Sequence, residues 1–548
     1  MTWKRRLPLL LAAVCWMATW TLVVAAEDKI PTQLRTLIDR EIQAGWQNQK
    51  LEPAKLAEDA EFLRRVSLDL VGAIPTHEQV VEFLSDKSTD KRIQQVDRLL
   101  SDPRFAKHQA EYWDLILFGR NPPGGEADKR DAILHWLETQ FSKNVPYDQW
   151  VRELLRAEGN SLDDGPALYY VQYRNRPEDM SEAVSQTFLG VQLQCARCHD
   201  HPYESWKQVD FYGMAAFLSR VQIVSLGKKD NLNRFVVAEK NSGDILFTGP
   251  VQEQRAGKKG EPIAPKFLHG TTAEEPPLPK DYKETKFEDN KVPAPPHYSR
   301  KNQLAEWLAN KENPYFSKAI ANRIWAQFMG RGLVHPVDHL SKSNPASHPE
   351  LLEQLTQGLV EHHFDLRWYI RELVTSEAYQ RSSQGGSADP YPAAHNYGRV
   401  RPLSAEELID SWRIATWHDR VEVTKKEPSK SRFEPLQGDY LRRFFGSPNT
   451  GTGDFQGGLQ EHLYLNNGPL GTLLNPGKGS LVDWLQKSED PLETKIDRVY
   501  LSVLTRHASP EEITRVSQFI NSSKDSKFVR WGDVVWALMT SSEFRFNH

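Results

Sequence analysis

The stretch Phe62-Leu63-Arg64-Arg65-Val66-Ser67-Leu68-Asp69-Leu70 indicates the fold class, because its apolar residues recur at spacings of three and four. That spacing places them on one face of an α-helix. The same spacing returns in Val80-Val81-Phe83-Leu84 and in Ile93-Val96-Leu99-Leu100. The sequence therefore predicts helices from Pro31 to about Arg220.

Local signals mark where these helices begin and end. Thr76 and Gln79 have the spacing of a capping box, and Asp102-Pro103 is typical of a helix boundary. In the second half of the chain, Asn313-Pro314 opens a helical segment that Gly330 closes. Helices are expected to dominate again from Ser299 onward.

Between the helical parts the pattern changes. Short runs rich in β-branched and aromatic residues, such as Val221–Val224 and Phe235–Val237, predict a small sheet. Glu274 to Pro296 is rich in proline and charge, which indicates a stiff linker. The expected fold is mainly α, with two helical domains and a small β-rich insertion and a Pro-rich linker between them. The expected segments are 1–26 (signal peptide), 27–220 (first helical domain), 221–273 (insertion), 274–298 (linker) and 299–548 (second helical domain).

The N-terminus has the pattern of a secretory signal. Lys4-Arg5-Arg6 precedes an uncharged apolar run from Leu7 to Val24, and Ala26 precedes charged residues. We expect cleavage after Ala26, and an uncleaved anchor is the alternative. The protein is thus expected to be exported, to the periplasm or cell envelope, with no membrane segment beyond the signal.

The composition limits the kinds of partner that the protein is expected to bind and the way in which it is stabilised. Removal of the signal takes three basic residues from a net charge of −4, which leaves about −7. An acidic chain without a basic patch is not expected to bind nucleic acid. Only Cys195 and Cys198 remain after cleavage, so an exported chain of this size must be stable without a disulfide framework.

Those two cysteines form Cys195-Ala196-Arg197-Cys198-His199, the arrangement to which c-type haem is attached. Two thiols three residues apart can add to the two vinyl groups, and the adjacent imidazole can ligate the iron. The sequence predicts one covalent haem c, bound by Cys195 and Cys198 with His199 as proximal ligand. We expect the motif to follow a helix spanning Met180 to Gln194.

Other interpretations of the motif stay open. A redox dithiol would need a βαβ context, which is absent, and a disulfide across two residues closes a small strained ring. Zinc could use Cys195, Cys198, His199 and His201, but four ligands within seven residues surround a tetrahedral ion poorly.

The distal ligand of the iron is less defined. Met214 is the nearest methionine downstream, although it lies in an apolar helical run whose simplest role is core packing. An open distal site is the alternative, and other candidates are Met180, Met329, His108, His135 and His269. Asp200 and Trp206 flank the motif and either tune the iron or form a solvated turn.

A second polar cluster lies near the middle of the chain. Its members are Asn322, Arg323, His335, Asp338, Asn344 and His348. They could form a site, but polar residues that hold loops between helices look the same, and that interpretation is favoured.

The chain resembles paired planctomycete domains of unknown function, a cytochrome-type domain followed by its usual C-terminal companion. Phe62–Leu70 and Cys195–Pro202 carry the first resemblance, and Ala321–Trp325 with Ser347–Leu352 carry the second. The resemblance implies export and haem, and it implies no established reaction. A second Cys-x-x-Cys-His is absent, which excludes a relay between two haems within this chain.

Three functions fit these observations. The first is a monohaem c-type cytochrome-like protein of the cell envelope, acting in electron transfer or haem-based sensing with an unidentified redox partner. The second is an exported haem enzyme that acts oxidatively on an envelope or polysaccharide substrate. The third is a non-catalytic scaffold whose Cys-x-x-Cys is structural. Whether the protein is an enzyme stays open from sequence.

Overall fold

The computed structural model describes residues 33–120, 130–229, 232–247, 260–282, 294–385, 391–420, 463–466, 468–474, 479–522 and 527–548. The expected signal peptide, residues 1–26, lies outside these ranges. Across the described ranges, no helix is both long enough and apolar enough to span a bilayer.

The first half of the chain is helical, as the apolar spacing predicted. Helix α1 shows the principle, because Leu34, Ile38, Ile42 and Trp46 recur every four residues and are all buried. The helices are α1 (Leu34–Gln49), α2 (Asp59–Val71), α3 (His77–Ser85), α4 (Lys91–Ser101), α5 (Pro103–Phe118), α6 (Asp131–Ser142), α7 (Tyr147–Arg156), α8 (Leu168–Val171), α9 (Pro177–Val184) and α10 (Gln208–Ala216).

The predicted helix boundaries are confirmed where the chain signals them. Thr76 and Gln79 form the capping box at the start of α3. Asp102 ends α4 and caps α5, in which Pro103 is the first residue. Gly330, with a φ of +74°, ends the helix that Asn313-Pro314 precedes.

The β-rich insertion is also confirmed. Strands β2 (Val221–Lys229) and β3 (Leu232–Glu239) form an antiparallel hairpin, with Ile223 opposite Val237. The short strand β1 (Gly159–Asn160) pairs with the other edge of β3. Strands β4 (Leu246–Phe247) and β5 (Glu261–Pro262) form a separate pair.

The second half is helical again, so the fold is mainly α. Its helices are α11 (Arg300–Leu308), α12 (Phe316–Met329), α13 (Pro349–Glu361), α14 (Leu366–Val374), α15 (Ala405–Ala415), α18 (Leu481–Lys487), α19 (Leu492–Leu504), α20 (Pro510–Ser522), α21 (Lys527–Met539) and α22 (Ser542–Arg545). The last strand, β7 (Phe546–Asn547), pairs with β6 (Arg401–Pro402).

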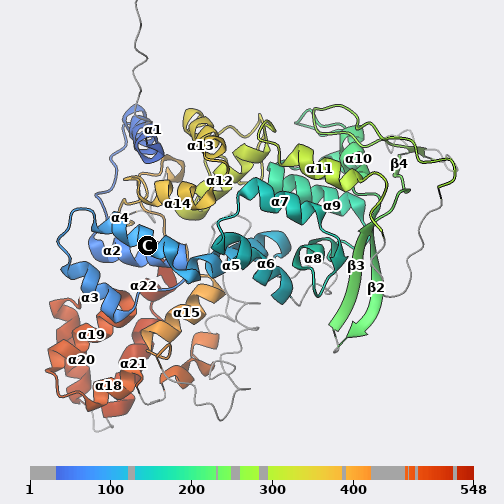
Figure 1. Ribbon diagram of the computed structural model, residues 1–548. Coiled ribbons are helices and arrows are strands. Elements are labelled where there is room, and N and C mark those ends of the chain that lie inside the picture. Colours follow the sequence, from blue (N-terminus) through green and yellow to red (C-terminus); the bar gives the residue numbers. More distant parts are fainter. Residues whose placement is uncertain are drawn as a thin grey trace, which may run out of the picture.

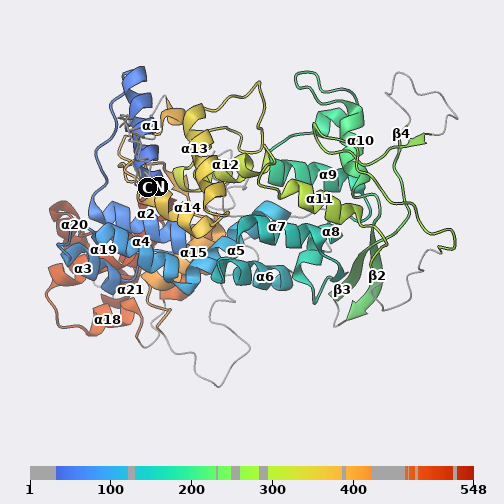
Figure 2. The same ribbon diagram turned by 45° about the horizontal axis from the view of Figure 1, so that its top comes forward.

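Two hydrophobic cores hold these elements together. The first consists mainly of residues from Leu34 to Tyr379 and takes residues from both sides of the proline-rich stretch. The second consists mainly of residues from Leu403 to Phe544. Figures 1 and 2 show the β2–β3 hairpin at the opposite end of the molecule from helices α18–α21. Helix α2 contributes to both cores, with Phe62 and Val66 in the first and Leu68 in the second.

Aromatic rings join the first helical segment to the second inside the first core. Trp113 of α5 contacts Trp150 of α7 with ring centroids 5.0 Å apart. Tyr147 contacts Trp150 at 5.0 Å and stacks on Phe316 of α12, also at 5.0 Å. Such ring pairs stabilise packing beyond the area that they bury. The helices before and after the proline-rich stretch are therefore packed as one body in this region.

The turn between α19 and α20 carries an ion-pair cluster whose stability depends on pH. Arg506 donates to both oxygens of Glu512, at 2.8 and 2.9 Å, and also pairs with Glu543. Hydrogen bonds from Arg506 lower the pKa of Glu512 from 4.5 to about 2. Because the pKa is lower in the folded protein, this stabilisation is present above about pH 5 and is lost toward pH 2.

We expect Glu512→Gln to lower the free energy of unfolding by about 1–2 kcal/mol at pH 7, after allowance for solvent screening, and by much less at pH 3. Urea unfolding at the two pH values measures this difference. The exposed Glu493 of α19 supplies the control, and Glu493→Gln is expected to change stability little at either pH. An equal effect of Glu512→Gln at both pH values would contradict the prediction.

Candidate functional site

The Cys-x-x-Cys-His motif lies in an exposed turn between α9 and α10. Helix α9 continues as one wider turn over Ser185–Leu189, and Gly190 ends it with a φ of +65°. The backbone angle favours glycine here, and a Cβ would also lie 3.0 Å from the side chain of Leu340, which is a tight contact. The expected helix over Met180 to Gln194 thus stops before the motif.

The motif itself is a short 3₁₀ turn, Gln194–Arg197. Ala196 is fully buried and anchors the turn, whereas Cys195 and Cys198 on either side of it are exposed and free. The backbone N–H of Cys198 donates to the carbonyl of Cys195 at 3.4 Å. Both thiols are therefore accessible to a ligand.

The ring of His199 is held in a defined state. Its Nδ1 lies 2.7 Å from the carbonyl oxygen of Asp200. Since a carbonyl oxygen only accepts, Nδ1 carries the hydrogen, and in the neutral imidazole Nε2 then has the free lone pair. A hydrogen bond of this kind is the usual outer contact of a metal-ligating histidine. His199 is thus ready to ligate a metal through Nε2.

Helix α10 stabilises the motif through hydrogen bonds from its first residue, Gln208. The backbone N–H of Gln208 donates to Asp200 Oδ1 at 2.9 Å, and Gln208 Nε2 donates to the carbonyl of Arg197 at 3.0 Å. Arg197 also pairs with Asp179 and Glu182 of α9. Asp200 therefore stabilises the turn. Of the two roles expected for it, tuning of the iron or formation of a solvated turn, these contacts fit the second.

The segment 338–344, which follows α12, contacts the chain on both sides of the motif. Before it, Gln186 and Gln192 donate to the carboxylate of Asp338, and Leu340 N–H donates to Gly190 O at 2.8 Å. After it, Ser343 Oγ donates to Glu204 Oε1 at 2.6 Å. We call residues 338–344 the clamp segment, because it holds both flanks of the motif in place.

The polar cluster noticed in the sequence holds this segment. Asn322 is fully buried in α12, donates to Val334 O at 2.9 Å and accepts from Val334 N–H at 2.9 Å. Asn344 donates to the carbonyls of His335 and His339. Arg323 donates to Thr187 O, in the turn that precedes the motif. These contacts are structural, so the favoured interpretation of the cluster agrees with its geometry.

A hollow of about 490 Å³ lies beside the loop that follows the motif. That volume is within the range of about 300–1,000 Å³ found for ligand pockets. We call it the aromatic hollow, because Tyr203, Trp206, His269 and Tyr315 line it. The rings of Trp206 and His269 pack with their centroids 4.4 Å apart, and Leu340 of the clamp segment also lines the hollow. Four separate parts of the chain thus meet there.

The residues considered as distal ligand lie in different places. Met214 is 1% exposed in α10, within the first core, and Met180 and Met329 are also buried in that core. His108 lies far along the chain, 3.9 Å from Glu407. His269 is exposed and lies on the ring of Trp206, next to the motif loop. Met214 stays a prediction, and it would have to leave the core to reach a group on the exposed thiols.

The zinc interpretation gains no geometric support. His201 Nδ1 accepts backbone N–H groups of Tyr203 and Glu204 at 3.2 and 3.0 Å, so it holds the loop closed. Among the residues that the structure describes, no three His, Cys, Asp or Glu side chains come together as a metal site.

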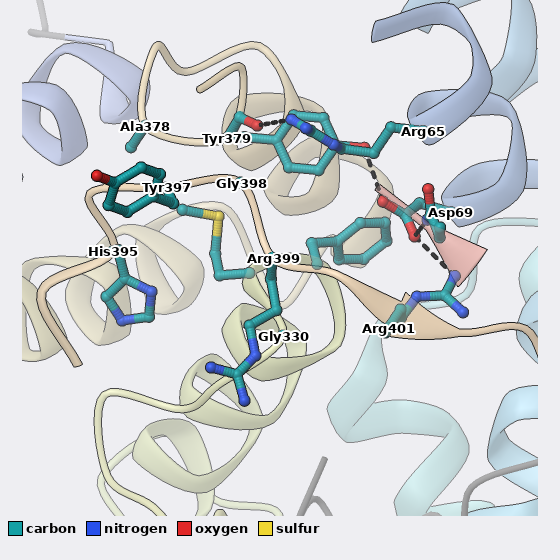
Figure 3. A pocket seen from close by; sticks show the side chains of 13 residues that line it. Arg65, Asp69, Gly330, Ala378, Tyr379, His395, Tyr397, Gly398, Arg399 and Arg401 are labelled. Carbon is teal, nitrogen blue, oxygen red and sulfur yellow. Dashed lines mark hydrogen bonds and ion pairs between the residues drawn. The ribbon is translucent and has the colours of Figure 1, made fainter. Parts of the chain in front are cut away.

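A different polar group lies where α2 meets the end of the chain (Figure 3). Asp69 accepts from Tyr379 Oη at 2.8 Å, from Arg401 at 2.8 Å and from Asn547 Nδ2 at 2.7 Å. We call this group the Asp69 joint. The cavity beside it measures about 20 Å³, which is room for about one water molecule. The joint is therefore a structural contact rather than a ligand pocket.

The fold and site define a mainly helical protein in which one domain presents a Cys-x-x-Cys-His turn and a second holds that turn in place. Residues 37–223 match the family model PSCyt2, described as a protein of unknown function (DUF1549). Residues 300–444 match the model PSD1, described as a protein of unknown function (DUF1553). The chain thus carries this pair of domains, in this order. Searches of the curated proteins and of the solved structures found no match.

Sequence reasoning found the motif and the polar cluster but did not connect them. Gln186 and Gln192, which bind Asp338, carried no signal of their own in the sequence. The aromatic hollow was also missed, because Tyr203, His269 and Tyr315 lie in separate segments that only the fold brings together. The isolated Gly190 was the one local hint, since a glycine that ends a helix often marks a close approach.

Proposed function

We propose that this is an exported protein of the cell envelope that carries one covalent haem c and transfers electrons through it. The observation that carries the proposal is the state of His199, whose Nδ1 hydrogen bond leaves Nε2 free beside two exposed thiols. The label of the matched PSCyt2 family is in keeping with a cytochrome-like role. The N-terminal signal pattern supports export.

The residues present fit the group. Each thiol of Cys195 and Cys198 would add across one vinyl double bond, with sulfur bonding to one vinyl carbon and the hydrogen going to the other. Nothing is released and no electrons are gained or lost, so attachment requires only that both thiols are in the reduced state. The bound haem would supply a one-electron redox centre, and His199 would hold it through Nε2. Asp200 and Gln208 keep the motif in this arrangement.

The clamp segment explains why the second domain belongs to this function. An electron carrier works best when its redox group and ligands move little. Contacts on both flanks of the motif, from Asp338 and Leu340 before it and from Ser343 after it, restrict the turn. We propose that the companion domain serves to fix the haem turn.

The first experiment is expression in a host that has cytochrome c maturation machinery. The wild type is expected to carry the mass of one haem and to give a c-type pyridine haemochrome spectrum. The Cys195→Ala, Cys198→Ala variant is expected to lose all covalent haem. Cys15 in the predicted signal is left unchanged, because the mature chain would lack it.

The spectrum of the oxidised protein then separates the haem functions. A six-coordinate low-spin iron fits a carrier, whereas a five-coordinate or water-ligated iron fits the enzyme or sensor alternatives. An apo mass for the wild type, despite competent maturation, would defeat the proposal and favour a scaffold with a structural Cys-x-x-Cys.

A further inference from the structure

We propose that the haem macrocycle binds in the aromatic hollow, so that the porphyrin lies against the clamp segment and the loop that carries Trp206, which follows the motif. This inference rests on the proposed function and adds the place where the group lies. It would make Tyr203, Trp206 and Tyr315 haem contacts and would leave no open substrate pocket at this position. An electron carrier, rather than an enzyme, would then be the role of the site.

The position of the hollow along the chain is the first argument. Tyr203 follows His199 by four residues, which can span at most about 14 Å even when extended. The loop is not extended, because His201 N–H donates to Trp206 O at 2.8 Å and closes it. A macrocycle attached to Cys195 and Cys198 covers surface within this reach of its thioether bonds, and the hollow offers a mainly apolar wall with a polar rim there.

The lining of the hollow is the second argument. Tyr203 is 85% exposed and lines the hollow, so a group bound there would cover its ring. The ring centroids of Trp206 and His269 lie 4.4 Å apart, and those of Trp206 and Tyr315 lie 6.1 Å apart. Flat aromatic and apolar walls suit a flat apolar ring system.

The charges at the rim are the third argument. Lys318 and Lys342 both line the hollow, and two propionates are the charged groups of a haem. Lys318 also pairs with Glu353, whereas Lys342 is exposed and makes no ion pair with any described residue. The one carboxylate at the rim, Glu204, accepts from Ser343, and hydrogen bonding lowers its pKa. The rim thus leaves Lys342 available for a propionate.

Chemical modification of Tyr203 tests the placement directly. N-acetylimidazole acetylates exposed tyrosine hydroxyls, and peptide mass spectrometry reads the extent at each site. In the haem-loaded wild type we expect Tyr203 to react at least several-fold more slowly than in the Cys195→Ala, Cys198→Ala protein. Tyr391, which is 54% exposed and lies outside the hollow, is the internal control and should react equally in both.

The outcomes separate the two proposals. Haem by mass with Tyr203 equally reactive in both proteins would overturn the placement and leave the proposed function standing. Absence of haem from the wild type would defeat both. Protection of Tyr203 in the loaded protein only when a soluble oligosaccharide is added would assign the hollow to a substrate and overturn the placement.

A second variant keeps the placement testable if the cysteine variant does not fold. Lys342→Glu would put a negative charge beside a propionate, which stabilises the oxidised iron and lowers the midpoint potential of the haem. Lys311→Glu makes the same charge change at an exposed residue that does not line the hollow, and it should leave the potential unchanged. Equal potentials in the two variants would contradict the placement.

Discussion

Asp69→Ala is expected to lower the free energy of unfolding by about 3–5 kcal/mol, the largest effect of any single substitution argued for this protein. Asp69 is 5% exposed and accepts three hydrogen bonds, from Tyr379, Arg401 and Asn547. Its removal would leave the Tyr379 hydroxyl and the Asn547 amide buried without an acceptor. Each buried donor left unpaired costs about 1–3 kcal/mol.

The neighbouring charges decide how much of that loss is electrostatic. Arg401 also donates two hydrogen bonds to Glu407, at 2.7 and 2.8 Å, so it keeps one carboxylate when Asp69 is removed. Burial raises the pKa of Asp69, although Arg401 acts against this. For Glu407, burial also raises the pKa, but the charge and hydrogen bonds of Arg401 outweigh it and the pKa is lowered. Arg401 is therefore held mainly by Glu407, and the cost of losing Asp69 comes mainly from its unpaired donors.

Chemical denaturation monitored by circular dichroism measures the effect. Asp97→Ala is the matched control, because Asp97 also pairs with an arginine, Arg371 at 2.6 Å, but is about half exposed. Exposed pairs contribute about 0–1 kcal/mol. If Asp69→Ala does not accumulate as folded protein, Tyr379→Phe removes a single hydroxyl and is expected to cost about 1–2 kcal/mol. A loss for Asp69→Ala no larger than for Asp97→Ala would contradict the role given to the joint.

The sequence was sufficient to predict structural features that depend only on residues close together in the chain, such as helices, helix caps and short strands. The apolar spacing of Phe62–Leu70 predicted a helix, and Thr76 with Gln79 predicted the capping box at the start of the next. The short runs rich in β-branched and aromatic residues predicted a small sheet, which contains β2 and β3. These features are decided within about a dozen residues, where periodicity and capping dominate.

Contacts between segments that are distant in the sequence could not be predicted from local patterns. Asp69 looked like a polar residue on an amphipathic helix, yet both faces of α2 are buried and its partners lie more than 300 residues away. Arg64, in the same helix, donates to carbonyls of Glu543 and Phe544. No local pattern announces such partners, because burial of α2 on two sides depends on where the second core forms.

The Cys-x-x-Cys-His site shows the same difference between local features and contacts across the chain. The motif and its two thiols were evident from five consecutive residues. The clamp segment was not, since Asp338 reaches Gln186 and Gln192 across about 150 residues. The polar cluster was correctly expected to hold loops, but which loops it held required the fold.

Asn322→Ala carries the second large effect and tests whether the clamp segment depends on that cluster. Asn322 is fully buried and pairs in both directions with the backbone of Val334, at 2.9 Å each way. Alanine would leave the N–H and carbonyl of Val334 buried and unpaired. We expect a loss of about 2–3 kcal/mol in the free energy of unfolding, which denaturant unfolding measures.

Hydrogen exchange shows whether that loss reaches the motif, which distinguishes a clamp from a merely buried amide. Val334 leads into the clamp segment, and Leu340 and Ser343 within it bond to the flanks of the motif. In Asn322→Ala, amides of residues 334–344 and of residues 190–206 should therefore lose protection together, while those of α19 keep theirs. Asn302→Ala, at an exposed position of α11, is the control and should change neither region. Loss of protection confined to 334–344 would mean that the motif turn is stable without the clamp, and that the companion domain does not fix it.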